Sequence, residues 1–153
     1  MSIRVPLTVR SLPNPRMAGV GGNTSIMRVN LGVAFAMPDG RPTPTWTASL
    51  DPGAPFSLLP RQLWELCAGS VRGQTTIRGI VRSPEGELPV QVGDVTCLLT
   101  AETGDRLALP ILSYLAYTDE VPVLLGYQGI LTEFGLRIDA EQGAGFLEVV
   151  RGS

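Results

Sequence analysis

Glycine and proline divide this chain into short runs, and that punctuation limits the folds open to it more than any other feature. Together they supply 31 of the 153 residues, 18 Gly and 13 Pro. Short apolar or alternating runs between turn residues are typical of strands in a small sandwich or barrel. We therefore expect an all-β fold, a small closed β-barrel or sandwich. The expected strands are Ile3 to Val9, Ile26 to Phe35, Thr45 to Leu50, Thr75 to Val81, Leu88 to Leu99, Leu107 to Ile111 and, with a break, Leu136 to Val150.

One or two short helices should accompany the strands. The run 60–68 has proline in its first turn and stops at Gly69, which indicates a helix. A second is expected over Gln128 to Phe134, ending at Gly135. The side chains expected to share the apolar face of the first helix are Leu63, Leu66 and Cys67.

The length is typical of one domain, so we expect residues 1–153 to form a single domain. Residues 1–24 should hold a terminal strand and a loop, because Ser11 to Thr24 shows no periodicity. Residues 25–150 should form the core. We expect the terminal strand, Ile3 to Val9, to be available for pairing with a partner subunit.

Composition excludes several classes of chemistry. The chain has no histidine, which removes Ser-His and Cys-His catalysis. Cys67 and Cys97 lack metal-ligand spacing, so neither a metal site nor a cofactor is expected. Twelve scattered basic residues in a chain of net charge -2 give no footprint for nucleic acid. No apolar stretch reaches the ~20 residues of a membrane span. Residues 1–10 lack a signal-peptide core, so we expect a cytoplasmic location and no membrane partner.

The segment from Trp46 to Pro60 is predicted to carry a strand, a tight turn that presents Asp51, and an apolar run into a helix. Gly53 would let the backbone turn back and bring amide N–H groups near the carboxylate. The flanking aliphatic residues would anchor the loop in the core. Asp-Pro-Gly is also a favourable turn sequence in its own right, so this segment alone leaves a purely structural turn open.

A second motif, Leu124-Leu125-Gly126, enters the second expected helix and then a strand. By itself it is typical of any buried strand that runs into a helix. Between the two motifs, residues 75–92 suggest a hairpin around Ser83-Pro84-Glu85-Gly86. An ordinary surface hairpin would have the same pattern.

Taken in order, with the two motifs about 75 residues apart, these segments resemble the retropepsin-like aspartic protease family, of the single-domain, homodimeric type. The resemblance covers roughly Ile26 to Val149. It implies that Asp51 is catalytic and that Pro52, Gly53 and Ala54 form the active-site loop. It also implies that Leu124, Leu125 and Gly126 support this loop. The candidates that it gives for the flap over the substrate are Arg78, Gly79, Ile80, Ser83, Pro84, Glu85 and Gly86.

The chemistry of this family needs two carboxylates that share one proton, so that one acts as base and the other as acid. The chain has one such loop. The resemblance therefore implies a homodimer in which Asp51 of each subunit meets at the two-fold axis, activating water against an extended peptide or protein substrate. Because one carboxylate must stay protonated, an acidic optimum is expected.

Two departures from the family pattern bear on activity. Pro52 stands where the family has Thr or Ser, whose hydroxyl links the two loops across the dimer. Proline has neither that hydroxyl nor a backbone N–H. Tyr127 and Gln128 replace a common Arg-Asp or Arg-Asn pair. One alternative is therefore a catalytically degenerate domain that dimerises and binds extended peptides without cleavage. The other is an unrelated small β-barrel used in protein assembly.

Other residues are expected to play structural roles. Trp46 and Trp64 are interpreted as packing residues, and Asp139, the fallback carboxylate, as a structural hydrogen-bond acceptor at a strand end. The acidic residues interpreted as solvated charges in turns are Glu85, Glu87, Asp94, Glu102 and Asp105.

Overall fold

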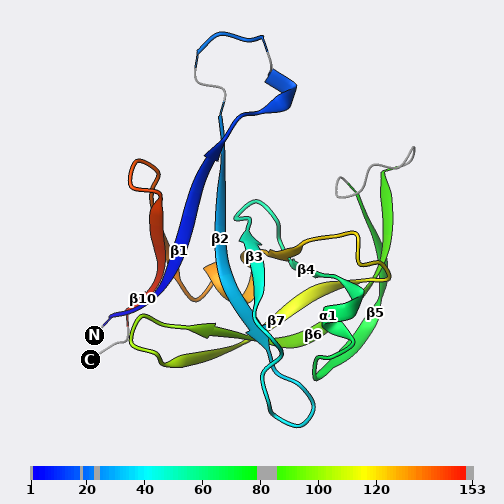
Figure 1. Cartoon of the computed structure of the whole chain (residues 1–153). Helices are drawn as coiled ribbons and strands as arrows, with labels where there is room; N and C mark the ends of the chain where they lie inside the picture. Colours follow the sequence, from blue (N-terminus) through cyan, green and yellow to red (C-terminus); the bar gives the residue numbers. More distant parts are fainter. Residues whose placement is uncertain (1, 18, 23–24, 79–85, 151–153) are drawn as a thin grey trace.

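A computed structural model of the chain describes residues 2–17, 19–22, 25–78 and 86–150. Its strands form one ten-stranded sheet in the order β5-β6-β7-β4-β8-β3-β2-β1-β10-β9 (Figure 1). The strands are β1 (Ser2–Leu12), β2 (Ile26–Phe35), β3 (Trp46–Leu50), β4 (Ser57–Leu59), β5 (Gly69–Arg78), β6 (Glu87–Thr100), β7 (Arg106–Ala116), β8 (Val123–Leu125), β9 (Gly135–Asp139) and β10 (Ala144–Val150). The helical segments are η1 (Pro15–Met17), α1 (Arg61–Trp64) and η2 (Tyr127–Leu131).

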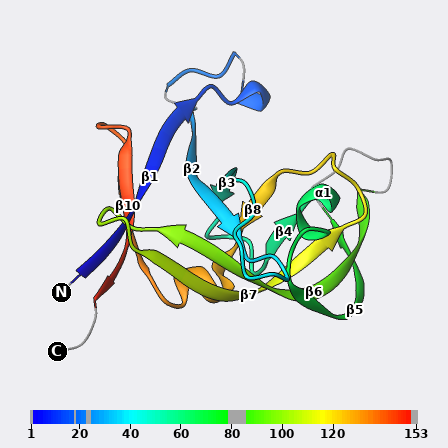
Figure 2. The ribbon, with the colours of Figure 1, turned by 60° about the horizontal axis from the view of Figure 1, so that its bottom comes forward.

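The sheet closes on itself through β6. Besides β5 and β7, this strand pairs with β2, where Phe35 lies opposite Cys97. Strands β2, β3, β8, β4, β7 and β6 therefore make a closed ring, seen from a second direction in Figure 2. Closure leaves no open edge within this ring, and the edges of the whole sheet are β5 and β9. The predicted all-β fold with a small closed barrel and short helices is confirmed.

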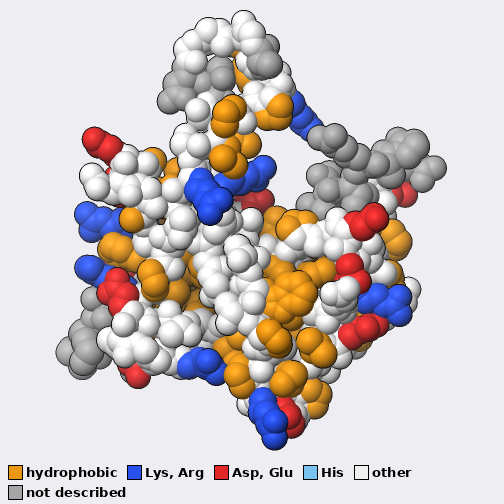
Figure 3. Space-filling view, viewed as in Figure 1, with side chains coloured by type: hydrophobic (Ala, Val, Ile, Leu, Met, Phe, Trp, Pro, Cys, Tyr) orange, Lys and Arg blue, Asp and Glu red, His pale blue; other side chains and the backbone are white. Residues whose placement is uncertain are grey.

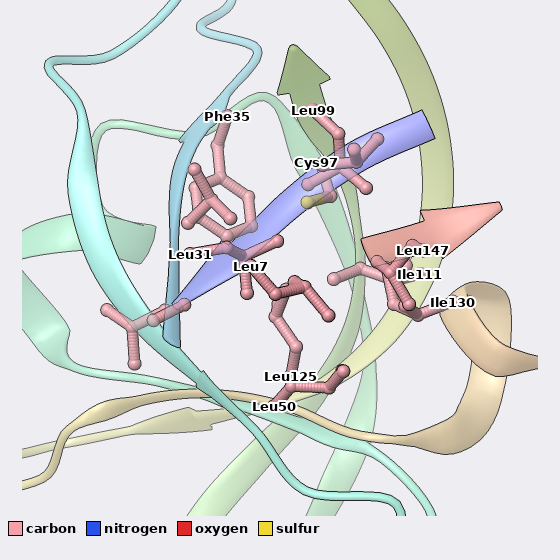
Figure 4. Close-up of a cluster of buried hydrophobic side chains, with 14 of the residues drawn as sticks. Leu7, Leu31, Phe35, Leu50, Cys97, Leu99, Ile111, Leu125, Ile130 and Leu147 are labelled. Carbon is pink, nitrogen blue, oxygen red and sulfur yellow. The ribbon is translucent and has the colours of Figure 1, made fainter. Parts of the chain in front are cut away.

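The core lies inside this ring. Phe35, Leu99 and Leu125 are fully buried, and Figure 4 shows them among aliphatic side chains from strands distant in sequence. The alternation that predicted the strands arises from this burial. In β1 the odd-numbered residues from Ile3 to Val9 are buried, and the residues between them are exposed. Every second side chain of a strand faces the same side.

Strand β1 pairs within its own chain. It runs antiparallel to β10 from Ser2 to Thr8 and antiparallel to β2 from Thr8 to Leu12. β1 buries alternate side chains together with Leu147 of β10, which fixes both strands in the sheet. Its pairing with β2 covers only Thr8 to Leu12, so pairing of this strand with a partner subunit stays a prediction.

Both expected helices are shorter than predicted. Segment α1 begins after Pro60, which caps the helix instead of lying in its first turn. Leu63 is fully buried, whereas Leu66 lies beyond the four-residue helix and is 42% exposed, so the predicted common face is wrong for Leu66. In η2, Gly129 has φ +81° and Gln128 has an extended backbone. This segment is therefore an irregular turn instead of a regular helix.

Strands β5 and β6 form a long hairpin that extends from the barrel. They pair from Gly69 opposite Val95 to Arg78 opposite Glu87, with an irregularity between Val71 and Gly73. The predicted hairpin is confirmed, although its first strand begins six residues before the expected Thr75. Among the described residues, no helix is long and apolar enough to cross a membrane.

Candidate active site

Asp51 lies at the point where three short strands meet. It directly follows β3, which runs parallel to β8, with Leu50 opposite Leu125. On its other side β8 runs antiparallel to β4. The chain therefore leaves β3, passes the end of β8 and returns as β4 on the far side. Leu50 and Leu125 are buried neighbours in Figure 4, so buried side chains hold the exposed turn that carries Asp51.

The turn fixes the Asp51 carboxylate through the backbone. The N–H of Gly53 donates to Oδ1 of Asp51 at 2.9 Å, and the N–H of Ala54 donates to the Asp51 carbonyl at 3.1 Å. The N–H of Asp51 donates to the carbonyl of Leu125 at 2.9 Å. Gly53 thus has the geometry expected from the sequence. The carboxylate is exposed and takes part in none of the ion pairs among the described residues.

The second motif supports this loop from beneath. The N–H of Tyr127 donates to the Ala54 carbonyl at 2.7 Å, and that of Gln128 donates to the Pro55 carbonyl at 3.0 Å. A Cβ on Gly126 would come within 2.4 Å of the Phe56 carbonyl oxygen, so only glycine fits there. The structure therefore brings the two motifs into contact, and the support role that the resemblance implies for Leu124, Leu125 and Gly126 stays a prediction.

Two polar side chains complete the support, and sequence analysis did not assign them. Ser57 is fully buried, and its Oγ accepts a hydrogen bond from the N–H of Gly126 at 3.1 Å. The Oε1 of Gln128 accepts one from the N–H of Leu112 at 2.8 Å. Gln128, interpreted only as a departure from the family, thus ties η2 to β7. The available signal for Ser57 was its place three positions after Ala54 and directly before the aliphatic pair Leu58-Leu59.

An apolar cavity of about 320 Å³ adjoins the aspartate loop. It lies between this loop and the end of the β5–β6 hairpin at which Arg78 is opposite Glu87. Phe56 packs edge-to-face on Tyr114, with ring centroids 5.5 Å apart, and Arg78 is paired with Glu87 at 2.7 Å. The residues that line the cavity are Ala54, Pro55, Phe56, Leu58, Ile77, Arg78, Tyr114 and Leu124.

The flap candidates fall partly outside the described residues. Arg78 ends β5, and Gly86 precedes β6 with φ +64°. The candidates that lie outside the described residues are Gly79, Ile80, Ser83, Pro84 and Glu85.

Pro52 is an exposed member of the loop. The N–H groups of its neighbours Asp51, Gly53 and Ala54 are all hydrogen-bonded within the chain, whereas proline has none to offer. Within the loop formed by residues 51–54, Pro52 is therefore the residue that can donate no hydrogen bond, because it has neither a backbone N–H nor a hydroxyl group.

Several predicted structural roles are visible. Trp64 and Trp46 pack against the core, and Asp139 accepts a hydrogen bond from the N–H of Gln142 at 3.0 Å. Two of the acidic residues interpreted as solvated charges in turns lie instead in β6. Asp94 is held by Arg72 through two hydrogen bonds of 2.5 and 2.8 Å. The other is Glu87, the partner of Arg78.

The two cysteines are free thiols. Burial raises the pKa of both Cys67 and Cys97 to about 12, so they are protonated at neutral pH and poor nucleophiles. Among the described residues, no group of three or more Cys, Asp or Glu side chains is placed to hold a metal ion.

No family model matches the chain, and no curated protein matches it either. Its structure is similar to that of a retropepsin-like aspartic protease from Rickettsia conorii, with a TM-score of 0.48 and 13% sequence identity over 97% of this chain and 92% of that one. It is also similar to EIAV protease in complex with the inhibitor HBY-793, with a TM-score of 0.39 and 20% identity over 70% of this chain and 88% of that one. The first is of the family that the two glycine motifs predicted.

Proposed function

We propose that this protein is an aspartic-type endopeptidase that acts as a homodimer. The observation that carries the proposal is the Asp51 turn. The turn lies across the junction of β3, β8 and β4, its carboxylate is exposed and aligned by the Gly53 N–H at 2.9 Å, and an apolar cavity lies beside it. The buried Ser57 and Gly126 lie beneath this turn and are joined by a hydrogen bond of 3.1 Å.

In the proposed reaction, Asp51 of each subunit lies at the two-fold axis and the pair shares one proton. The ionised carboxylate takes a proton from water while the water oxygen bonds to the peptide carbonyl carbon. The protonated carboxyl group donates its proton to the carbonyl oxygen. In the second step the carboxyl group that took the proton from water donates it to the amine nitrogen, and the other carboxylate takes a proton from a hydroxyl group of the tetrahedral intermediate. The C–N bond breaks, which leaves a carboxylic acid, an amine and one proton again shared by the pair. An apolar substrate side chain would occupy the 320 Å³ cavity.

Pro52 favours a second candidate, a dimer that binds extended peptides without cleaving them. The family hydroxyl that links the two loops is missing, and a loosely held pair of carboxylates loses the separation at which it shares a proton. The fold and the cavity would be unaffected, so peptide binding would persist.

The test combines the mass in solution with cleavage of a denatured protein at acidic and neutral pH. The wild type is compared with Asp51→Asn, which keeps the size of the side chain and removes its charge, and with Pro52→Thr. A dimer whose cleavage vanishes in Asp51→Asn supports the peptidase. A dimer that cleaves nothing in any form but binds peptides supports the second candidate. A monomer, or cleavage that survives Asp51→Asn, contradicts both.

A further inference from the structure

The connection between β1 and β2 forms an exposed arm, defined here as residues 11–17, 19–22 and 25–28. It rises from the sheet in Figures 1 and 2. None of its residues is buried, and it holds four of the eight large hydrophobic side chains that are exposed among the described residues. These are Leu12 (40% exposed), Met17 (39%), Val20 (53%) and Met27 (49%). Connections of this length are uncommon in small domains.

The arm is also basic. The arm holds Arg16 and Arg28 and no acidic residue, and Arg10 directly precedes it. The first acidic residue of the chain is Asp39, and Arg4, the fourth arginine before it, lies in β1 and pairs with Glu148. The other eight arginines share residues 39–153 with all fourteen acidic residues, so that part has a formal charge of -6. Figure 3 shows hydrophobic and basic side chains over the arm and its base. The chain is thus divided into a positive arm region and a negative body.

Two of these arginines are placed unfavourably within a single chain. Arg10 and Arg28 lie directly opposite each other in the β1–β2 pair, and both are exposed. Like charges opposed across strands destabilise a sheet. Neither side chain, nor that of Arg16, forms an ion pair or side-chain hydrogen bond within the described part of the chain, whereas Arg41, Arg61, Arg72 and Arg78 all do.

The base of the arm lies at the same end of the sheet as Asp51. Strands β2 and β3 are antiparallel, with Asn30 opposite Ser49. This last pair of the ladder is two residues from Arg28 along β2 and two residues from Asp51 along the chain. A second subunit that brings its own Asp51 to this point must therefore approach the base of the arm.

We propose that the arm docks on a second copy of this chain, with the arm of each protomer lying on the acidic body of its partner. This inference rests on the homodimer of the proposed function. Opposite charges on arm and body favour such a pair, and two-fold symmetry makes every contact twice. The arm also extends the interface at the aspartate loops, where Pro52 offers neither hydroxyl nor N–H.

The test measures the dimer dissociation constant by sedimentation of the full chain. The variant Met17→Ser/Val20→Ser/Met27→Ser removes apolar contacts, and its matched control is Val71→Ser/Leu66→Ser, at positions that are 54% and 42% exposed on other elements. The arm variant should weaken the dimer at least about tenfold, because each lost side chain counts twice. The control should leave the constant unchanged.

The charges are tested separately. Arg10→Gln/Arg16→Gln/Arg28→Gln should weaken the dimer and flatten its salt dependence, because screening acts on exposed charges. Arg106→Gln is the control, since that exposed arginine lies outside the arm and has no ion pair among the described residues.

The outcomes separate this inference from the proposed function. A dimer that keeps its dissociation constant in both arm variants overturns arm docking, while cleavage that depends on Asp51 would still support the peptidase. Arm variants that lose affinity for an acidic peptide with no change in dimerisation would assign the arm to substrate and likewise overturn the inference. A weakened dimer in both arm variants, with neither control affected, supports it.

Discussion

Replacing Ser57 with alanine should destabilise the fold, whereas the same change at Ser113 should not. The two serines are opposite partners in the β4–β7 pair, and both are completely buried. The Oγ of Ser57 accepts a hydrogen bond from the N–H of Gly126 at 3.1 Å. The Oγ of Ser113 has no partner in the described structure. Comparing the two variants therefore isolates the contribution of one hydrogen bond to the free energy of unfolding at matched positions.

The magnitude follows from what each change leaves behind. Ser57→Ala leaves the N–H of Gly126 buried and unpaired, which costs about 1–3 kcal/mol of unfolding free energy. Ser113→Ala removes an unsatisfied hydroxyl group, so its effect should lie within about 0.5 kcal/mol of zero or be slightly stabilising. The loss of one hydroxyl group and the strand environment are common to both changes.

Urea unfolding at one fixed protein concentration measures the difference, since dimerisation makes stability depend on concentration. The slope of free energy against urea should be the same for both variants. An equal loss in the two variants, or no loss in Ser57→Ala, would refute the role given to the Ser57–Gly126 bond in supporting the aspartate loop.

Three further predictions concern single features. Gly126→Ala should cost at least about 2 kcal/mol of stability and abolish any cleavage, because a Cβ would meet the Phe56 carbonyl oxygen at 2.4 Å, whereas Gly73→Ala, with no atom within 4 Å, should be tolerated in urea unfolding. Cys67 and Cys97 should resist thiol alkylation until the chain unfolds. Because burial raises their pKa to about 12, the folded state should also lose stability as pH rises above the unfolded-state value near 9, but not below it. Arg72→Gln should lower the free energy of unfolding by at most about 1 kcal/mol in urea, because Arg72 is exposed and Asp94 is only half-buried.

The sequence predicted most of the strands because burial imposes the alternation that it shows. The strands that it did not separate, β4 and β8, have only three residues each, too few to show a period. The sequence did not predict where α1 and η2 end, because tertiary contacts set these ends. Trp64 donates to the Ala116 carbonyl at 2.6 Å, and Gly129 has no space for a Cβ beside Pro110 and Ile111. Neither constraint is local in sequence.

At the candidate site, residue type and spacing predicted the turn that presents Asp51, because a turn glycine close to a carboxylate has a local signature. Ser57 bonds to Gly126, which is 69 positions away in the sequence, and Gln128 bonds to Leu112, which is 16 positions away. The cavity likewise joins Phe56 to Tyr114 and Ile77. Such contacts depend on which strands become neighbours, and a single sequence does not specify that.

The central claim, that two copies of Asp51 share one catalytic site, is tested most directly by mixing wild-type and Asp51→Asn protein, allowing subunits to exchange, and following peptide cleavage against the wild-type fraction. If the site needs both carboxylates, only wild-type pairs are active, so an equal mixture should retain about a quarter of the wild-type rate. A decline in direct proportion to the wild-type fraction would contradict the shared site, since each subunit would then act alone.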